Sequence, residues 1–384
     1  MSADVELLIV GGGCAGLSLA MQLAKRQQQA PRTLILEQRG HYDNDRTWCF
    51  WGDDTTPLAT LAAHQWRTVS VRNGGRVAQL DCAQTPYRML SSAQFYAAAV
   101  AALTAAPKLQ LQMATSLLSE PHCRGGHWHV ETSAGPLTAS RVVDTRPLVP
   151  ATGGALLWQS FHGHEIECEQ PVFDPDCAVL MDFSNASPER VAFSYVLPTS
   201  RTRALVEFTV FAAQPLAAAA LAADLDAAIT QRVRGAAFTR LRSEYGVLPM
   251  GLSASPTLAA PPEQAASYVR AGLFAGAARP ATGYAFQRIQ RWAADCAACL
   301  ADGGAAVGHP SDPRFSAWMD RLFLSVIERQ PQLAPHLFAD MFGRVEGQRI
   351  IRFLSDRGRL SDQAAVVLAL PFKPFLQQLF RRRA

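Results

Sequence analysis

The sequence predicts a mixed α/β fold, in which a parallel sheet flanked by helices is interrupted by an inserted antiparallel sheet and followed by a helical tail. Three observations predict it. An apolar strand and a glycine-rich turn occupy residues 5–16, strand-like segments dominate residues 158–211, and helical segments broken by prolines follow residue 313. A strand ending at Asp144 and a strand–loop–helix at 269–301 can join the first sheet, which makes the strand-rich stretch an insertion.

Residues 5–37 have the order of a dinucleotide-binding βαβ unit. Val5–Val10 is an apolar strand, the turn after it reads Gly-x-Gly-x-x-Gly, and a second apolar strand, Thr33–Leu36, ends next to an acid. The residues expected to bind the nucleotide here are Gly11, Gly13, Ala15, Gly16 and Glu37.

These positions have distinct physical roles in such a unit. Gly11 permits a sharp turn, Gly13 lets a pyrophosphate approach the backbone, and Gly16 lets the helix pack close to the strand. The helix N-terminus offers N–H groups to the phosphates. Glu37 is spaced to accept from ribose hydroxyls, and its charge disfavours the 2′-phosphate of NADP. An N-terminal unit without a second copy is typical of flavoproteins, so we expect a Rossmann-like domain that holds FAD.

Composition excludes several classes of protein. The 384 residues carry a net charge of +4, too small to indicate nucleic-acid binding, and the longest apolar runs are too short to span a bilayer. The N-terminus lacks the pattern of a signal peptide, which predicts a cytoplasmic protein. Cys296 and Cys299 have no second cysteine pair nearby, and His162 and His164 have no evident further ligands, so we expect no metal site.

The predicted domains are discontinuous along the chain. Residues 1–150 and 265–310 are expected to form the FAD-binding domain. Residues 151–264 are expected to form the sheet domain that binds the substrate, and residues 311–384 a helical C-terminal region.

Several segments resemble one known family, in order and at similar length over nearly the whole chain. The segments are Thr47–Phe50, Trp158–Gly163, Val179–Phe183, Phe193–Pro198, Arg203–Thr209, Tyr245–Met250, Arg270–Phe274 and Pro280–Tyr284. The most specific are Arg-Ala-Gly-Leu-Phe at 270–274 and Pro-Ala-Thr-Gly-Tyr at 280–284. They resemble the bacterial lycopene β-cyclase family, whose members form the end rings of carotenoids.

The resemblance implies a flavoprotein that uses noncovalent FAD in its reduced form, with NAD(P)H as the expected source of electrons. The implied substrate is lycopene or a related linear carotenoid, whose ends close to β-ionone rings without net redox change, giving γ- and β-carotene. A membrane-resident substrate further implies a peripheral position on the inner face of the cell membrane. Apolar helical segments around Phe315 and Phe380, followed by Arg381–Arg383, suit an interfacial helix and a packed C-terminal helix equally well.

Ring closure requires an acid in a dry place, because an alkene is a very poor base. We expect Glu207 to supply the proton. Strand alternation places it on one face with Leu205, Thr209 and Phe211, and burial there raises the pKa of a carboxyl group. A partly exposed, salt-bridged glutamate is the plainer alternative. The family motif often has a second acid after this glutamate, but Phe208 stands there, which leaves Glu207 as the sole acid of its motif.

Aromatic faces can stabilise a carbocation without reacting with it. Trp48 and Tyr195 are the residues we expect in this role, and Phe50 and Trp51 are further candidates. Core packing is the alternative for each of them.

Two further motifs are expected near the flavin. Thr282, Gly283 and Tyr284 form a loop between a strand and a helix, and such a loop is expected to wrap the flavin with backbone N–H groups. Asp144 lies in an Asp-x-Arg sequence that resembles one seen near the flavin in related enzymes; a turn or helix-cap carboxylate is the alternative.

Three hypotheses for function follow from these patterns. The first is a redox-neutral carotenoid cyclase. The second is an FAD-dependent oxidoreductase, such as a hydroxylase or a polyprenyl reductase, which consumes NAD(P)H in proportion to product. The third is a nucleotide-binding polyene carrier without catalysis, which is indifferent to the loss of Glu207.

Overall fold

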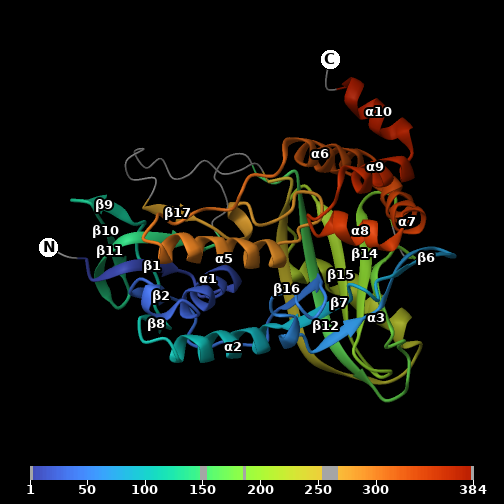
Figure 1. Ribbon diagram of the computed structural model, residues 1–384. Coiled ribbons are helices and arrows are strands. Elements are labelled where there is room, and N and C mark those ends of the chain that lie inside the picture. The colour runs from blue at the N-terminus through green and yellow to red at the C-terminus, as the bar shows by residue number, and fades with distance from the viewer. Residues whose placement is uncertain (1–2, 148–153, 185–186, 253–266, 382–384) are drawn as a thin grey trace.

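Two seven-stranded sheets form the body of the molecule (Figure 1). The computed structural model describes residues 3–147, 154–184, 187–252 and 267–381. Within those residues a third sheet of three strands packs against the cores of both large sheets. The predicted domain boundaries near residues 150 and 264 lie outside the described residues.

The first sheet contains the predicted βαβ unit. Its strands are β1 (Val5–Val10), β2 (Thr33–Leu36), β8 (Leu109–Gln112), β9 (His122–Arg124), β10 (His127–Thr132), β11 (Gly135–Asp144) and β17 (Tyr268–Arg270). Their order is β8-β2-β1-β11-β10-β9, and β17 pairs with the end of β11. Val143 of β11 lies in parallel register between Ile9 and Val269. The chain after residue 267 therefore returns to this sheet, as predicted.

Three helices pack on or beside the first sheet. They are α1 (Cys14–Ala24), α2 (Ser92–Thr104) and α5 (Phe286–Ala301), and α1 lies against both of the others (Figure 1). Ala20 of α1 and Ala293 of α5 are fully buried, and such small side chains let helix backbones approach closely. This packing fixes the start of α1, and with it the glycine turn.

The second sheet is mainly antiparallel. Its strands are β5 (Thr68–Asn73), β6 (Arg76–Asp81), β12 (Leu157–Cys168), β13 (Cys177–Asp182), β14 (Val191–Pro198), β15 (Arg203–Ala212) and β16 (Phe238–Met250). Their order is β16-β12-β15-β14-β13-β5-β6, so the predicted sheet over 158–211 is confirmed. β16 was not predicted, because its first residues are exposed and include two arginines. β5 pairs in parallel with β13, so residues 68–81 belong to this sheet although the sequence placed them within the first domain.

The two faces of the second sheet have different neighbours. Helix α3 (Ala218–Val233) covers one face, where Val206, Phe208 and Val210 are buried. Leu205 and Phe211 belong to the core on the opposite face. The predicted alternation of β15 is therefore correct, and Glu207 lies on the face away from α3.

The helical tail packs on that opposite face. It consists of α6 (Arg314–Arg329), α7 (Ala334–Arg344), α8 (Gly347–Leu354), α9 (Leu360–Ala369) and α10 (Phe372–Arg381). Among the described residues, no helix is long and apolar enough to cross a membrane. Helix α10 extends away from the body at the end of the chain (Figure 1). The three-stranded sheet, β3 (Thr47–Trp51), β4 (His64–Trp66) and β7 (Tyr87–Ser91), completes the fold.

Candidate active site

A cavity of about 1020 Å³ is lined by residues of both large sheets. The glycine turn lies at one end, strands β12, β14, β15 and β16 at another, and α7 and α8 supply a third part of the wall. The predicted site residues that line it are Gly11, Gly13, Ala15, Glu37, Trp48, Tyr195, Glu207, Thr282, Gly283 and Tyr284. Gly16 and Asp144 do not line it.

At the glycine end, each glycine has a different constraint. Gly11 has a φ of +100°, a conformation that favours glycine. A Cβ on Gly16 would lie 2.0 Å from the backbone oxygen of Gly11, so this position admits no side chain. A Cβ on Gly13 would meet nothing within 4 Å, and α1 begins there without a side-chain cap. The first N–H groups of α1 are thus available to a phosphate, and this turn fits a dinucleotide.

Glu37 follows β2 and is buried, with 5% of its surface exposed. Its carboxylate accepts from the backbone N–H of Arg39 at 2.9 Å and from the Arg39 Nε at 3.0 Å. Burial alone would raise its pKa, but the hydrogen bonds and charge of Arg39 outweigh burial, and the pKa lies below its ordinary value. Glu37 is therefore an anionic acceptor at the edge of the cavity.

Asp144 reaches the cavity only through another residue. Its carboxylate accepts from Arg146 Nη2 at 2.7 Å and from the Tyr268 hydroxyl at 2.7 Å, and its side chain is fully buried. Arg146 lines the cavity. The Asp-x-Arg sequence thus places an arginine at the site, with the aspartate behind it as its anchor.

The loop containing Gly283 differs from the expectation in its hydrogen bonding. The Gly283 N–H donates to the Arg279 carbonyl at 2.9 Å, and the Tyr284 N–H donates to the Thr282 hydroxyl at 3.3 Å. These amides are used within the loop because it folds back on itself in a tight turn, with Gly283 at a φ of +68°. In this structure these amides are therefore not free to donate to a flavin, and the prediction that they wrap it stays a prediction.

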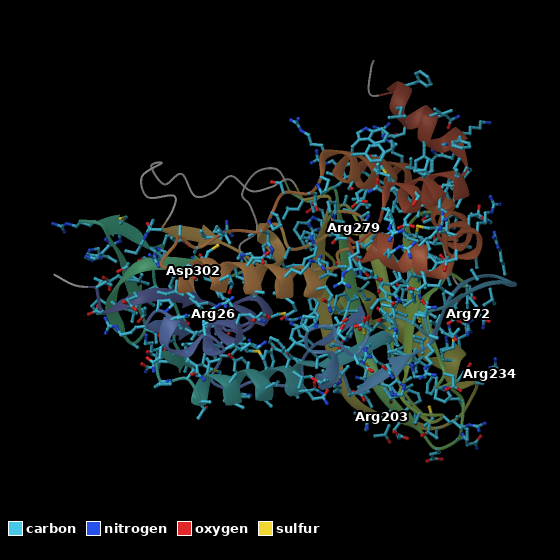
Figure 2. All side chains as sticks on the ribbon, viewed as in Figure 1. Arg26, Arg72, Arg203, Arg234, Arg279 and Asp302 are labelled. Atoms are coloured by element: carbon cyan, nitrogen blue, oxygen red, sulfur yellow. The ribbon has the colours of Figure 1, made fainter. Side chains whose placement is uncertain are left out.

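The start of α5 is a better donor to the cavity than the loop before it. Helix α5 begins without a side-chain cap, and its first-turn residues, Phe286 to Arg288, line the cavity. The positive end of its dipole therefore faces the cavity. Arg279, labelled in Figure 2, anchors the preceding loop to the tail: it is buried, and its Nε lies 3.1 Å from Asp320 of α6.

At the opposite end, two carboxyl groups lie on either side of a strand residue that has no side chain. Glu207 of β15 and Glu244 of β16 both pair with Gly163 of β12, which lies between them. Gly163 has no side chain, and a Cβ there would lie 2.6 Å from Glu207 Cγ. Tyr195 of β14 is the next residue in the same row. The register of four strands thus gathers these side chains.

The setting of Glu207 favours its protonated form. Only 7% of its surface is exposed, and burial, followed by the charge of Glu244 and a hydrogen bond with it, raises the pKa of Glu207 well above its usual value. A carboxylic acid kept neutral at pH 7 can act as a proton donor.

Glu244 is the functional residue that sequence reasoning missed. It is 5% exposed and accepts from the Thr47 hydroxyl at 2.7 Å and from Arg242 Nη1. Arg242 also donates to Thr47 at 2.7 Å and to Glu165 at 2.5 Å. The available signal was its place directly before the Tyr245–Met250 segment of the family resemblance.

Aromatic side chains form the wall beside Glu207. The Tyr195 hydroxyl lies 2.9 Å from the Tyr87 hydroxyl, and Trp51 lies against Tyr87 and Tyr284, with ring centroids 4.7 and 5.7 Å away. Burial raises the pKa of all three tyrosines, so they are neutral. Trp48 points to the other side of β3, where its ring stacks on Phe286 at 5.7 Å.

An apolar part of the cavity continues from Glu207 toward the tail. The sheet contributes Leu180, Met181, Phe193 and Phe211, and the tail contributes Phe338, Met341 and Phe342 of α7 and Leu354 of α8. This part suits an elongated hydrocarbon.

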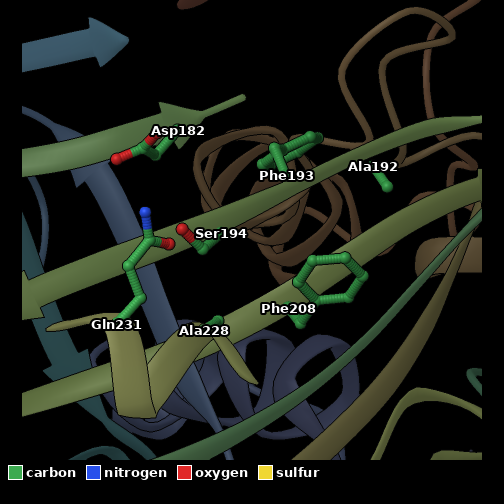
Figure 3. A pocket seen from close by; sticks show the side chains of 7 residues that line it. All are labelled: Asp182, Ala192, Phe193, Ser194, Phe208, Ala228 and Gln231. Carbon is green, nitrogen blue, oxygen red and sulfur yellow. The ribbon is translucent and has the colours of Figure 1, made fainter. Parts of the chain in front are cut away.

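A much smaller pocket lies on the opposite face of the sheet. A pocket of about 10 Å³ there is lined by Asp182, Ala192, Phe193, Ser194, Phe208, Ala228 and Gln231 (Figure 3). Asp182, Ser194 and Gln231 turn toward one another in it. Such a volume holds one water molecule at most. Within the part of the chain that is described, no group of three or more His, Cys, Asp or Glu residues is placed to hold a metal ion.

The fold is that of known flavoenzymes. It is similar to a geranylgeranyl bacteriochlorophyll reductase-like protein from Thermoplasma acidophilum, with a TM-score of 0.62, 13% identity and 98% of each chain covered. It is also similar to p-nitrophenol 4-monooxygenase PnpA from Pseudomonas putida DLL-E4 (TM-score 0.58, 15% identity, 98% of this chain and 99% of that one). The flavin-dependent monooxygenase PieE, solved with FAD and substrate, has a TM-score of 0.59 at 14% identity, covering 96% of this chain and 72% of that one. The predicted fold class is confirmed.

Proteins with similar sequences identify the family more specifically than the similar structures do. The chain is 26% identical over 385 residues to a lycopene beta-cyclase of Paracoccus sp. (strain N81106 / MBIC 01143), covering 95% of this chain and 94% of that protein. It is 28% identical over 323 residues to a lycopene beta cyclase of Synechococcus elongatus (strain ATCC 33912 / PCC 7942 / FACHB-805), covering 78% of this chain and 72% of that protein. The family model described as "Lycopene cyclase protein" matches residues 6–380, and the chain therefore belongs to the lycopene cyclase family.

Proposed function

We propose that this protein is a lycopene β-cyclase, which closes the ends of lycopene or a related linear carotenoid to β-ionone rings, giving γ- and β-carotene. The observation that carries the proposal is Glu207, a buried carboxyl group with a raised pKa at an aromatic-walled end of the cavity. Family membership and the names of the two relatives support the substrate class.

In this mechanism Glu207 protonates the terminal alkene of the polyene. The cation closes onto the neighbouring double bond, and loss of a ring proton completes the β-ring, so the reaction is redox-neutral. Water has to be excluded, because it would compete for the proton and trap the cation. Trp51, Tyr195 and Tyr284 present neutral aromatic surface in place of water, and aromatic faces attract a cation.

The glycine turn, Glu37 and the start of α5 are proposed to hold FAD. The α1 N-terminus would take the pyrophosphate and Glu37 the ribose. When bound and reduced, with electrons from NAD(P)H, the flavin supplies negative charge beside the cation. The positive end of the α5 dipole facing the cavity favours such an anion.

The substrate is proposed to enter from a membrane contacted by the tail. Helices α6, α9 and α10 expose large apolar side chains, namely Phe315, Trp318, Leu360, Val367, Leu368, Phe372, Leu376 and Phe380. This surface would rest on the cytoplasmic face of the cell membrane. The predicted basic cluster Arg381–Arg383 lies outside the residues whose side chains are described. Co-sedimentation with anionic liposomes tests the contact: Phe380→Ser with Phe315→Ser should reduce binding, and unchanged binding would reject this surface.

Expression in a lycopene-making bacterium tests the function. The wild type should convert lycopene to β- and γ-carotene, and Glu207→Gln should leave lycopene unconverted, with a loss of about 10²–10⁴-fold for a missing general acid. Glu167→Gln is the matched control, because this half-buried glutamate of β12 does not line the cavity. Unchanged lycopene with the wild type would reject the cyclase, and NAD(P)H consumption in proportion to product would favour an oxidoreductase.

A further inference from the structure

We propose that Glu244 is a positioning residue whose anchored carboxylate shares one proton with Glu207, so that the two side chains act as a carboxylic acid–carboxylate dyad. The inference rests on the proposed function, because it assigns Glu207 as the acid. It goes beyond that function by supplying the second acid that is missing from the motif around Glu207, where Phe208 stands.

The geometry of the sheet creates the dyad. Glu207 and Glu244 lie on the two strands that flank β12, both in register with Gly163. Neighbouring strands are about 4.8 Å apart, so two side chains separated by one strand meet only if the residue between them leaves room. Gly163 leaves that room, and both carboxyl groups line the same cavity.

The two carboxyl groups have unequal partners, and this decides where the proton lies. Arg242 and Thr47 hold Glu244. Among the ion pairs of the described residues, Arg242 contacts Glu244 and Glu165 but not Glu207. The negative charge therefore resides on Glu244, and the proton on Glu207. Two like charges this close cannot both persist in a buried site at low cost.

Three of the other titratable groups around the pair are neutral. Cys49 of β3 is buried, and burial raises its pKa to about 12. Tyr87 of β7 and Tyr195 of β14 are neutral phenols. Of the charged groups that face the dyad, Arg242 and Glu165 pair with each other. After burial, Glu244 is thus the largest influence on the proton of Glu207.

The proton and electron balance closes within the dyad. The O–H bond of Glu207 breaks as a C–H bond forms with the terminal alkene's π electrons, and a second π pair forms the ring C–C bond. Both carboxyl groups are then charged, and their repulsion favours return of a proton. The ring C–H bond breaks, its electrons form the new double bond, and the proton returns to Glu207. No oxidant, reductant or solvent proton is consumed.

An acid that is protonated at the working pH transfers its proton at a higher overall rate than a stronger acid that is mostly deprotonated at that pH. Each unit by which a pKa lies below the working pH reduces the protonated fraction about tenfold, while proton-transfer rates change by less than tenfold per unit. When the pKa of a carboxyl group is held near the working pH, the rise in its protonated fraction therefore outweighs the loss in its acid strength.

The test is the pH dependence of the purified holoenzyme acting on lycopene in liposomes. In Glu244→Gln the decline of turnover with rising pH should begin about one unit or more lower than in the wild type, a tenfold loss on the alkaline side with recovery at acidic pH. Glu244→Asp, which keeps the charge, should restore part of the difference. Glu167→Gln removes a half-buried glutamate of β12 that does not line the cavity, and it should leave this decline where the wild type has it.

Infrared difference spectroscopy gives a readout that does not need turnover. The protonated carboxyl band of Glu207, identified by its loss in Glu207→Gln, should persist to higher pH in the wild type than in Glu244→Gln. If the wild type made no cyclised carotenoid, the proposed function would fail while the band still decided the dyad. A uniform loss of activity at every pH in Glu244→Gln, with an unshifted band, would make Glu244 purely structural and overturn the inference.

Discussion

The two ends of the cavity are assembled in different ways. At the glycine end, the groups proposed to hold the pyrophosphate and the ribose come from one continuous stretch, from Gly11 to Glu37. At the acid end, Glu207, Glu244 and Tyr195 come from three strands, and Thr47 comes from a different sheet. Local sequence determines the first end, and strand register determines the second.

The two ends also treat their carboxyl groups in opposite ways. Arg39 keeps Glu37 ionised although it is buried, and the pKa of Glu37 is lowered. Glu207 is deeply buried, lies beside another carboxylate and lacks an arginine of its own, so its pKa is raised. The two side chains are similarly shielded from solvent, but Glu207 lies deeper in the protein, so deeper burial, the neighbouring carboxylate and the absence of an arginine of its own together reverse the direction of the pKa shift.

Gly16→Val should break the glycine end alone and have the largest effect. The backbone oxygen of Gly11 occupies the space of its Cβ, so the turn must move, and we expect flavin affinity to fall more than about 100-fold, equivalent to about 3 kcal/mol. Flavin fluorescence after gel filtration measures the loss. Gly40→Ala is the control, because a Cβ there meets nothing. Retention of full flavin by Gly16→Val would contradict this account of the turn.

Gly163→Ala should break the acid end and spare the glycine end. The new methyl group would displace the Glu207 side chain from the row, and we expect turnover to fall about 10- to 100-fold, as for a catalytic group moved by about 1 Å. The flavin content should match that of the wild type. Pigment analysis with flavin quantification separates the two ends, and a joint loss of flavin and turnover would argue against their independence.

The opposite pKa shifts predict opposite stability effects of pH. Glu207 binds its proton more tightly when folded, so its contribution to stability is present below the unfolded pKa and is lost as pH rises toward the folded pKa. Glu207→Gln should therefore gain stability relative to the wild type between pH 5 and pH 8, by up to about 1.4 kcal/mol per pH unit. Thermal unfolding at several pH values measures it.

Glu37 supplies the matched comparison, with the reverse sign. Its lowered pKa gives stability that is present above the unfolded pKa and is lost as pH falls through the folded one. Glu37→Gln should accordingly lose stability relative to the wild type near neutral pH and match it at acidic pH. Parallel pH dependence of the two variants would mean that the two acids do not differ as described.

The same contrast explains what the sequence could predict. The βαβ unit and the face of Glu207 follow from periodicities within single segments, and both are correct. Glu244 could not be inferred, because its meeting with Glu207 depends on the register of β16 against β12 across Gly163. The hydrogen bonds within the Gly283 loop could not be inferred for a similar reason, because they leave no trace in residue type.

Phe208→Leu changes the residue next to Glu207, and it should have the smallest effect on the acid end. Phe208 faces α3, where it lines the 10 Å³ pocket (Figure 3), and it does not line the large cavity. We expect turnover within about twofold of the wild type and a loss of about 1 kcal/mol in the free energy of unfolding, because the smaller side chain leaves a gap against α3. Denaturant unfolding and pigment analysis measure the two quantities. Because side chains alternate along the strand, a large loss of turnover in Phe208→Leu would mean that the α3 face contributes to the acid end. Position 208, where the family motif often has its second acid, would then act through the sheet, and Glu244 would not replace it.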